Sequence, residues 1–172
     1  MRCLIVACLS AALAAPARAE VVSSTAAGFE VRAQAIVTAP PEAAWAMLAR
    51  VGEWWNPAHS YSGKAENLSL RPEIGGCFCE TLGTGGVEHM RVVYAQPGEM
   101  LRLQGGLGPL QAEAAAGTLT WTLKKVGGGT EITQTYVVGG YMRMGAEKLA
   151  PLVDKVLAEQ LGRLQAKLGP RR

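Results

Sequence analysis

The chain has 172 residues, with 17 basic and 14 acidic side chains and a formal charge of +3. This length suits one domain with its own hydrophobic core. The small net charge provides no basic field of the kind that nucleic acid or anionic lipid attracts, so we expect no nucleic-acid partner.

The N-terminus has the pattern of a cleavable secretory signal. Arg2 precedes an uncharged apolar run at residues 3–14, which is too short to span a bilayer, and residues 17–19 read Ala-Arg-Ala. We predict a signal peptide at residues 1–19 and a bacterial periplasmic or secreted protein. The alternatives are a buried N-terminal helix and a lipoprotein signal at residues 5–8, in which Cys8 would be acylated.

Removal of this signal would leave 153 residues, with 15 basic and 14 acidic side chains. Of the four cysteines, Cys77 and Cys79 would remain. An oxidising compartment favours a disulfide, but residues i and i+2 of a regular strand hold their Cβ atoms about 7 Å apart, whereas a disulfide needs about 4 Å. We therefore expect two buried thiols without a bond between them.

The first elements are a strand and a short helix. Apolar residues alternate over residues 29–37, and prolines at 40 and 41 then open a helix with Trp45, Leu48 and Val51 on one face. Strands are predicted near residues 68–70, 77–81, 87–95 and from 101, separated by Gly- and Pro-rich turns. Residues 105–116 are expected to be irregular, and residues 118–125 and 130–138 to form a strand pair.

The last segment has the clearest periodicity. Eight apolar residues recur at spacings of three and four, which predicts a helix of about twenty residues with all eight facing a sheet. They are Leu149, Leu152, Val153, Val156, Leu157, Leu161, Leu164 and Leu168. The order strand, short helix, antiparallel strands, long helix indicates an α+β domain without repeats or linkers. No further segment is long and apolar enough for a membrane span.

Four short motifs in this order resemble the START-like (SRPBCC) superfamily, in its polyketide cyclase-like and heat-shock-protein ATPase activator-like branch. They are Pro-Glu-Ala-Ala-Trp at 41–45, Gly-Glu-Trp-Trp at 52–55, Ile-Gly-Gly-Cys-Phe at 74–78 and Gly-Thr-Glu-Ile-Thr at 129–133. The resemblance implies a helix-grip fold, an antiparallel sheet wrapped around a long C-terminal α-helix, over residues 29–168. Residues 20–28 would be an N-terminal extension and residues 169–172 a tail. It also implies a cavity for hydrophobic ligands.

The hairpin that starts at Cys77 carries candidate chemistry. With a two-residue turn at Thr84-Gly85, Cys77 and Cys79 face the core, while Glu80 and His89 form a cross-strand pair on the other face. That pair is either a surface ion pair or part of a polar site. The cysteines could bind a metal ion with His89 only if it shared their face, so we expect neither a metal nor another cofactor.

Aromatic residues are concentrated after the short helix, although they make up only 6% of the chain. They either close the core or line the mouth of a cavity, where ring faces and polar tips bind an apolar ligand. The candidate ligand-binding residues are therefore Trp54, Trp55, His59, Tyr61, Cys77, Cys79, Glu80 and His89.

We favour a binding module for a small hydrophobic or amphipathic molecule over an enzyme. The chain has no Ser-His-Asp order, no metalloprotease helix and no phosphate-binding loop, so no catalytic residue is assigned. One alternative is a cyclase or hydrolase that uses His59 or the Glu80–His89 pair as acid and base. The other is a protein-interaction module related to ATPase activators. Nothing in the sequence indicates an oligomer.

Overall fold

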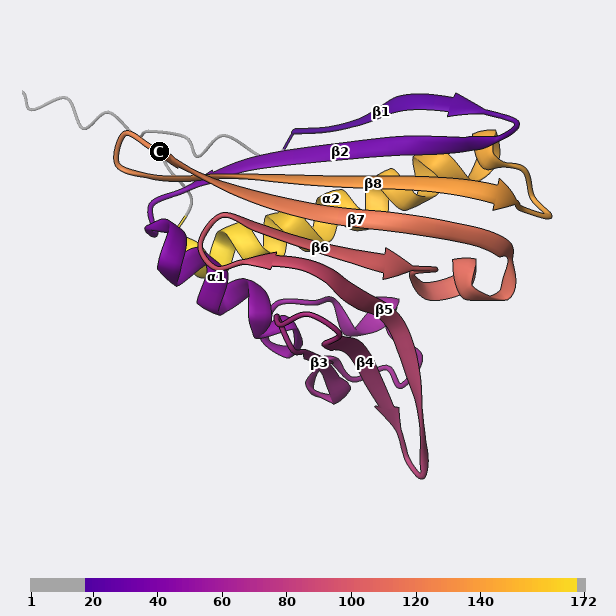
Figure 1. Cartoon of the computed structure of the whole chain (residues 1–172), viewed down its shortest axis with the longest axis horizontal. Coiled ribbons are helices and arrows are strands. Elements are labelled where there is room, and N and C mark those ends of the chain that lie inside the picture. The colour runs from indigo at the N-terminus through magenta and orange to yellow at the C-terminus, as the bar shows by residue number, and fades with distance from the viewer. Residues whose placement is uncertain (1–17, 170–172) are drawn as a thin grey trace, which may run out of the picture.

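The computed structural model describes residues 18–169, which form one antiparallel eight-stranded sheet and two α-helices (Figure 1). The strand order is β1-β2-β8-β7-β6-β5-β4-β3. The strands are β1 (Arg18–Thr25), β2 (Gly28–Val37), β3 (Leu68–Leu70), β4 (Cys77–Leu82), β5 (Gly85–Gln96), β6 (Met100–Gly105), β7 (Ala114–Val126) and β8 (Gly129–Tyr141). The helices are α1 (Pro41–Ala49) and α2 (Ala146–Leu168), and four short 3₁₀ turns lie at Val51–Glu53, Pro57–His59, Ala65–Asn67 and Gly108–Ala112. The predicted α+β helix-grip architecture is confirmed.

The sheet begins earlier than the sequence pattern indicated. Residues 20–25, expected as an extension before the domain, lie in β1 and pair antiparallel with β2. The predicted signal peptide falls mostly on residues 1–17, outside the described residues, and Arg18 and Ala19 are the first residues of β1. Of the predicted tail, residues 170–172 are also outside the described part. No helix within residues 18–169 is long and apolar enough to cross a membrane.

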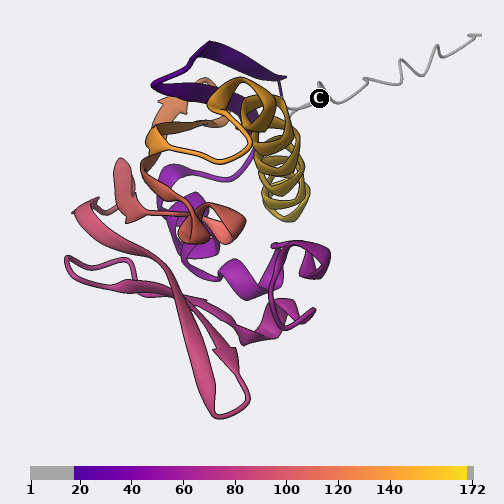
Figure 2. The same cartoon turned by 90° about the vertical axis from the view of Figure 1, so that its right-hand side faces the viewer.

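Helix α2 packs along β1 and β2 at one end of the sheet and also contacts α1 (Figure 2). Its second half is buried as predicted, through Leu157, Leu161, Leu164 and Leu168. The expectation that all eight apolar positions face the sheet is wrong for the first half, where Leu152 is 53% exposed. In this half the fully buried positions are Ala146 and Ala150, whereas Leu149, Leu152, Val153 and Val156 line a cavity.

The strand pair predicted at residues 118–125 and 130–138 is confirmed as part of β7 and β8. Leu119, Trp121 and Leu123 are buried while the threonines between them are half-buried. Strand β7 starts at Ala114, inside the stretch expected to be irregular, because residues 114–117 pair with the end of β8. Backbone pairing with a long neighbouring strand thus overrides the poor strand propensity of Ala and Gly.

The two halves of α2 should differ in their contribution to stability. Leu161 is 1% exposed, so Leu161→Ala should lower the free energy of unfolding by about 2–5 kcal/mol through lost burial and a residual cavity. Leu152→Ala removes the same atoms from a mostly exposed site and should cost less than about 1 kcal/mol. Urea denaturation measures both, and equal losses would contradict the described packing of α2.

Candidate functional site

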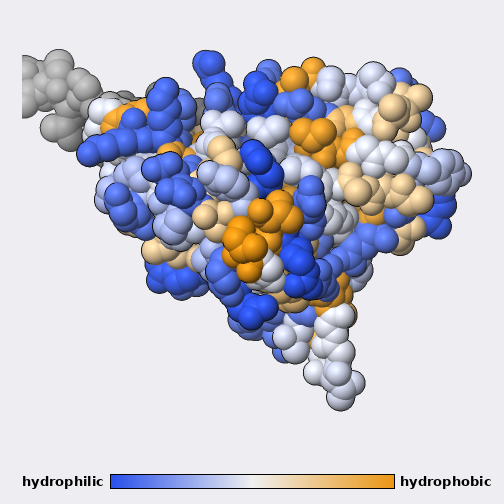
Figure 3. Space-filling view, viewed as in Figure 1, coloured by the Kyte–Doolittle hydropathy of each residue, from blue (hydrophilic) through white to orange (hydrophobic). Residues whose placement is uncertain are grey.

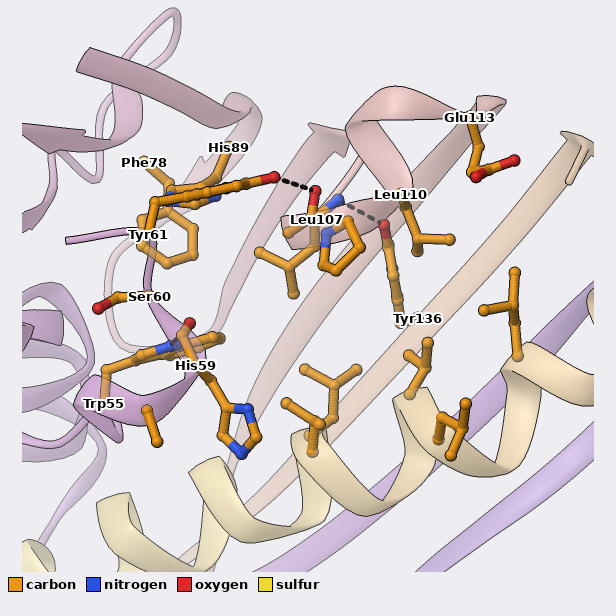
Figure 4. A pocket seen from close by; sticks show the side chains of 18 of the residues that line it. Trp55, His59, Ser60, Tyr61, Phe78, His89, Leu107, Leu110, Glu113 and Tyr136 are labelled. Atoms are coloured by element: carbon orange, nitrogen blue, oxygen red, sulfur yellow. Dashed lines mark hydrogen bonds between the residues drawn. The ribbon is translucent and has the colours of Figure 1, made fainter. Parts of the chain in front are cut away.

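A cavity of about 460 Å³ lies between the first half of α2, the segment after α1, and the 3₁₀ turn that follows β6 (Figure 4). Its walls are mainly apolar and come from segments far apart in the chain. The lining residues are Trp55, Ala58, His59, Ser60, Tyr61, Leu68, Phe78, His89, Leu107, Gly108, Pro109, Leu110, Glu113, Tyr136, Met144, Leu149, Leu152, Val153, Val156 and Leu157.

The segment after α1 forms one wall because it is fixed to α2. The backbone N–H of Asn56 donates to Oε1 of Gln160 at 2.7 Å. The side-chain oxygen of Asn56 caps the next turn by accepting from the N–H of Ala58 at 3.0 Å. The indole Nε1–H of Trp55 donates to the carbonyl of His59 at 2.9 Å. These bonds hold the rings of Trp55 and His59 at the cavity.

Glu80 of β4 is a buried carboxylate that connects this segment to the sheet. Its Oε2 accepts from the N–H of Tyr61 at 3.0 Å and lies 3.1 Å from Nε2 of His89, while its Oε1 accepts from the N–H of Ser62. Burial raises the pKa of Glu80, but the hydrogen bonds from Ser62, Tyr61 and His89 outweigh burial and hold this pKa below its ordinary value. Glu80 is therefore ionised at neutral pH.

His89 of β5 is the neutral partner of this carboxylate. Burial lowers the pKa of His89, and the hydrogen bond and charge of Glu80 oppose that effect only in part. An ionised carboxylate only accepts hydrogen bonds, so Nε2 of His89 carries the proton and Nδ1 keeps a lone pair. Among the described residues, Nδ1 has no hydrogen-bond partner.

The hairpin that carries this pair differs from the predicted register. The turn is Gly83-Thr84 instead of Thr84-Gly85, and Glu80 lies opposite Val87 instead of His89. A register shift between Phe78 and Cys79 leaves His89 as an extra residue in β5. Such a bulge sets two residues against one and breaks the alternation of faces.

This bulge also changes the environment of the pair. His89 and its neighbour Met90 are both buried, at 4% and 1% exposure. Glu80 and His89 therefore meet in the interior, and the interpretation of a surface ion pair is wrong. The strict alternation of an unbulged strand could not place two consecutive residues inside.

The expectation of two free thiols is also wrong, because Cys77 and Cys79 form a disulfide. Their Cα atoms are 5.4 Å apart, closer than the roughly 6.6 Å of a regular strand. The register shift between β4 and β5 falls at the same point. The sulfur atoms and a Glu88 carboxylate oxygen lie within 4.8 Å of one another, but metal binding there would need the thiolate form of the cysteines.

The structure brings half of the predicted site residues to the cavity wall. These are Trp55, His59, Tyr61 and His89. His59 lies at the edge next to α2, where its Nε2 is 3.2 Å from Oε2 of Glu159. The ring of Tyr61 stacks on that of His89 with a centroid distance of 5.9 Å, and its hydroxyl donates to the carbonyl of Gly108 at 3.0 Å (Figure 4).

The other four predicted residues do not line the cavity. Glu80 is not part of the cavity wall, but its carboxylate accepts a hydrogen bond from His89, which is. Trp54 is 1% exposed in the core, where its Nε1–H donates to the carbonyl of Met47 at 3.0 Å. Cys77 and Cys79 lie on β4, away from the cavity wall.

Tyr136 of β8 is a lining residue that the sequence analysis missed. Its hydroxyl donates to the carbonyl of Gly105 at 3.2 Å and accepts from the N–H of Leu107 at 3.1 Å, and burial raises its pKa to about 12. The ring lies across Gly117, where an added Cβ would be 2.3 Å from a ring carbon. A tyrosine that follows three threonines in β8, near a glycine of the partner strand, was the available signal.

A model of the polyketide cyclase / dehydrase and lipid transport family matches residues 28–169. A comparison with curated proteins finds no match. Solved structures match the fold over most of the chain. The Aha1 dimer from Colwellia psychrerythraea has a TM-score of 0.58 at 16% identity, covering 81% of this chain and 95% of that one.

Two further structures show the same fold. Protein MLL2253 from Mesorhizobium loti has a TM-score of 0.57 at 17% identity, covering 80% of this chain and 94% of that one. CalU16 from Micromonospora echinospora has a TM-score of 0.54 at 13% identity, covering 84% and 77%. At these identities the likeness concerns the fold alone.

The buried pair should make stability fall in acid. Both pKa values are lowered in the folded state, so the unfolded chain takes up protons first as the pH drops. The free energy of unfolding should therefore decrease below about pH 6.5 through His89 and again below about pH 4.5 through Glu80.

Urea denaturation between pH 7.5 and pH 5 tests this for His89. His89→Gln keeps a donor for Glu80 but does not titrate, so its stability should depend less on pH in this range. Phe78→Leu is the control: it removes a neighbouring ring and should lower stability by a similar amount at each pH. An unchanged slope in His89→Gln would show that His89 is not held neutral.

Proposed function

The chain belongs to the polyketide cyclase / dehydrase and lipid transport family, and we propose that it binds a small hydrophobic or amphipathic molecule in the cavity between the sheet and α2. The observation that carries the proposal is the cavity itself, about 460 Å³ in volume with mainly apolar walls. This volume is within the usual range for small-molecule sites.

The first half of α2 supports this proposal. Leu149, Val153 and Val156 continue the apolar stripe, yet they are only partly buried, and they line the cavity together with the exposed Leu152. A ligand in the cavity would remove their surfaces from water, at about 25 cal/mol per Å² of apolar area. A bound apolar molecule would thus complete the packing that the stripe begins.

An acid–base enzyme of the cyclase or hydrolase type is the second candidate, and the Glu80–His89 pair favours it. The carboxylate fixes the tautomer of the imidazole, so that His89, which lines the cavity, carries an unprotonated and buried Nδ1. Such an enzyme would lose its activity in His89→Gln and follow a pH profile set by His89. Full activity of that variant on a substrate found for the protein would exclude this mechanism.

Support for an interaction module is weaker. On the face seen in Figure 3, hydrophobic residues form only small groups among hydrophilic ones. Contiguous apolar patches are what mark most protein-binding surfaces.

Export to the periplasm or outside the cell is also part of the proposal. The disulfide between Cys77 and Cys79 supports it, because such bonds persist mainly in oxidising compartments. Intact-mass analysis of the protein after expression in a bacterium should give a chain that begins at Glu20 with the disulfide formed. A protein that keeps residues 1–19, or free thiols, would contradict this assignment.

Ligand binding can be tested by native mass spectrometry of the purified protein. We expect a small molecule to co-purify, and its occupancy to be lost in Val156→Trp, which fills the cavity from α2. Lys155→Trp places the same ring on the exposed side of the same helix and should keep the ligand. An empty wild-type protein that also fails to bind apolar compounds would contradict the proposal.

A further inference from the structure

We propose that Nδ1 of His89 is the hydrogen-bond acceptor that selects the ligand, so that the cavity takes a neutral, largely apolar molecule with a hydroxyl group in preference to a carboxylic acid. The inference rests on the proposed binding function and names the chemical class of the ligand.

The tryptophan, serine and tyrosine side chains that line the cavity have no free hydrogen-bond donor. Each of these groups already donates its hydrogen to a backbone carbonyl oxygen within the protein. They are the indole of Trp55 and the hydroxyls of Ser60, Tyr61 and Tyr136. A ligand carboxylate needs several donors to replace its hydration, so these groups cannot hold one without breaking bonds of the fold.

The charges around the cavity also disfavour an anion. None of the described residues that line it is Lys or Arg. The lining carboxylate of Glu113 is paired with Arg143 at 2.9 Å, and His59 with Glu159 at 3.2 Å. A ligand carboxylate at His89 would also lie close to the ionised Glu80, at a considerable cost in a buried setting.

His89 offers the opposite kind of group, a free acceptor. Its side chain is 96% buried, it lines the cavity, and Nδ1 has no partner among the described residues. A buried acceptor that lacks a hydrogen bond is destabilising, so a ligand that supplies an O–H there is favoured. The rings of Tyr61 and Phe78 lie against His89 and surround this polar position with apolar surface (Figure 4).

The acceptor is also fixed in its tautomer. Glu80 is held by the N–H groups of Tyr61 and Ser62, so its charge cannot turn away from His89. As long as the proton stays on Nε2, Nδ1 can accept a hydrogen bond but cannot donate one. The pair therefore favours O–H groups over carbonyl or carboxylate oxygens.

Three probes that differ in one group test this assignment: 4-hexylphenol, hexylbenzene and 4-hexylbenzoate, measured by isothermal titration at pH 7.5. Wild-type protein should bind the phenol about three- to tenfold more tightly than hexylbenzene, as one added hydrogen bond gives. The benzoate should bind more than about tenfold more weakly than the phenol. In His89→Phe the ratio of phenol to hexylbenzene affinity should fall to about one, whereas Lys155→Phe, on the outer side of α2, should keep it.

The outcomes separate this inference from the binding function. Equal affinity for the phenol and hexylbenzene, or tightest binding of the benzoate, would overturn the role of His89 and leave the cavity as a binding site. Failure of all three probes to bind would contradict both proposals.

A measurement on the wild-type protein covers the case in which His89→Phe does not fold. Nitrogen NMR should show Nδ1 of His89 unprotonated and its resonance moved by the phenol but not by hexylbenzene. A protonated Nδ1, or equal shifts with both probes, would overturn the assignment.

Discussion

The site depends on one buried anion, the carboxylate of Glu80. It accepts hydrogen bonds from two consecutive backbone N–H groups, at Tyr61 and Ser62, and from the imidazole of His89. A buried charge is tolerated only when it is paired or hydrogen-bonded in this way. The same contacts attach the segment after α1 to the sheet, and this attachment gives the cavity its aromatic wall. The carboxylate of Glu80 thus both holds the cavity wall in place and orients the imidazole of His89.

The elements that the sequence could predict are those in which local periodicity and tertiary packing agree. The alternation of β7 and the apolar spacing in the second half of α2 persist because each of these stretches buries one continuous face. Even in α2 the apolar pattern identified one face of the helix but not what that face packs against. Leu157 lies in the core and Leu152 is mostly exposed at the cavity, although their spacing fits a single stripe.

Several features that the sequence analysis placed wrongly arise from a single extra residue. The bulge at His89 moves the register of the β4–β5 hairpin and puts two neighbours inside, and it falls at the point where Cys77 and Cys79 approach each other. The register expected from a Thr84-Gly85 turn assumed an unbroken alternation of faces. Tyr136 was missed because the position of its ring depends on a contact with Gly117 of the neighbouring strand, and the sequence alone does not show this contact.

In the proposed binding mode, the cavity under α2 holds a neutral apolar molecule whose hydroxyl donates to His89. A crystal structure of the protein with 4-hexylphenol tests this binding mode. The alkyl chain should lie against Val153 and Val156, and the phenol oxygen should lie within hydrogen-bond distance of Nδ1 of His89. A probe bound elsewhere on the protein, or one in the cavity with its hydroxyl turned away from His89, would contradict it.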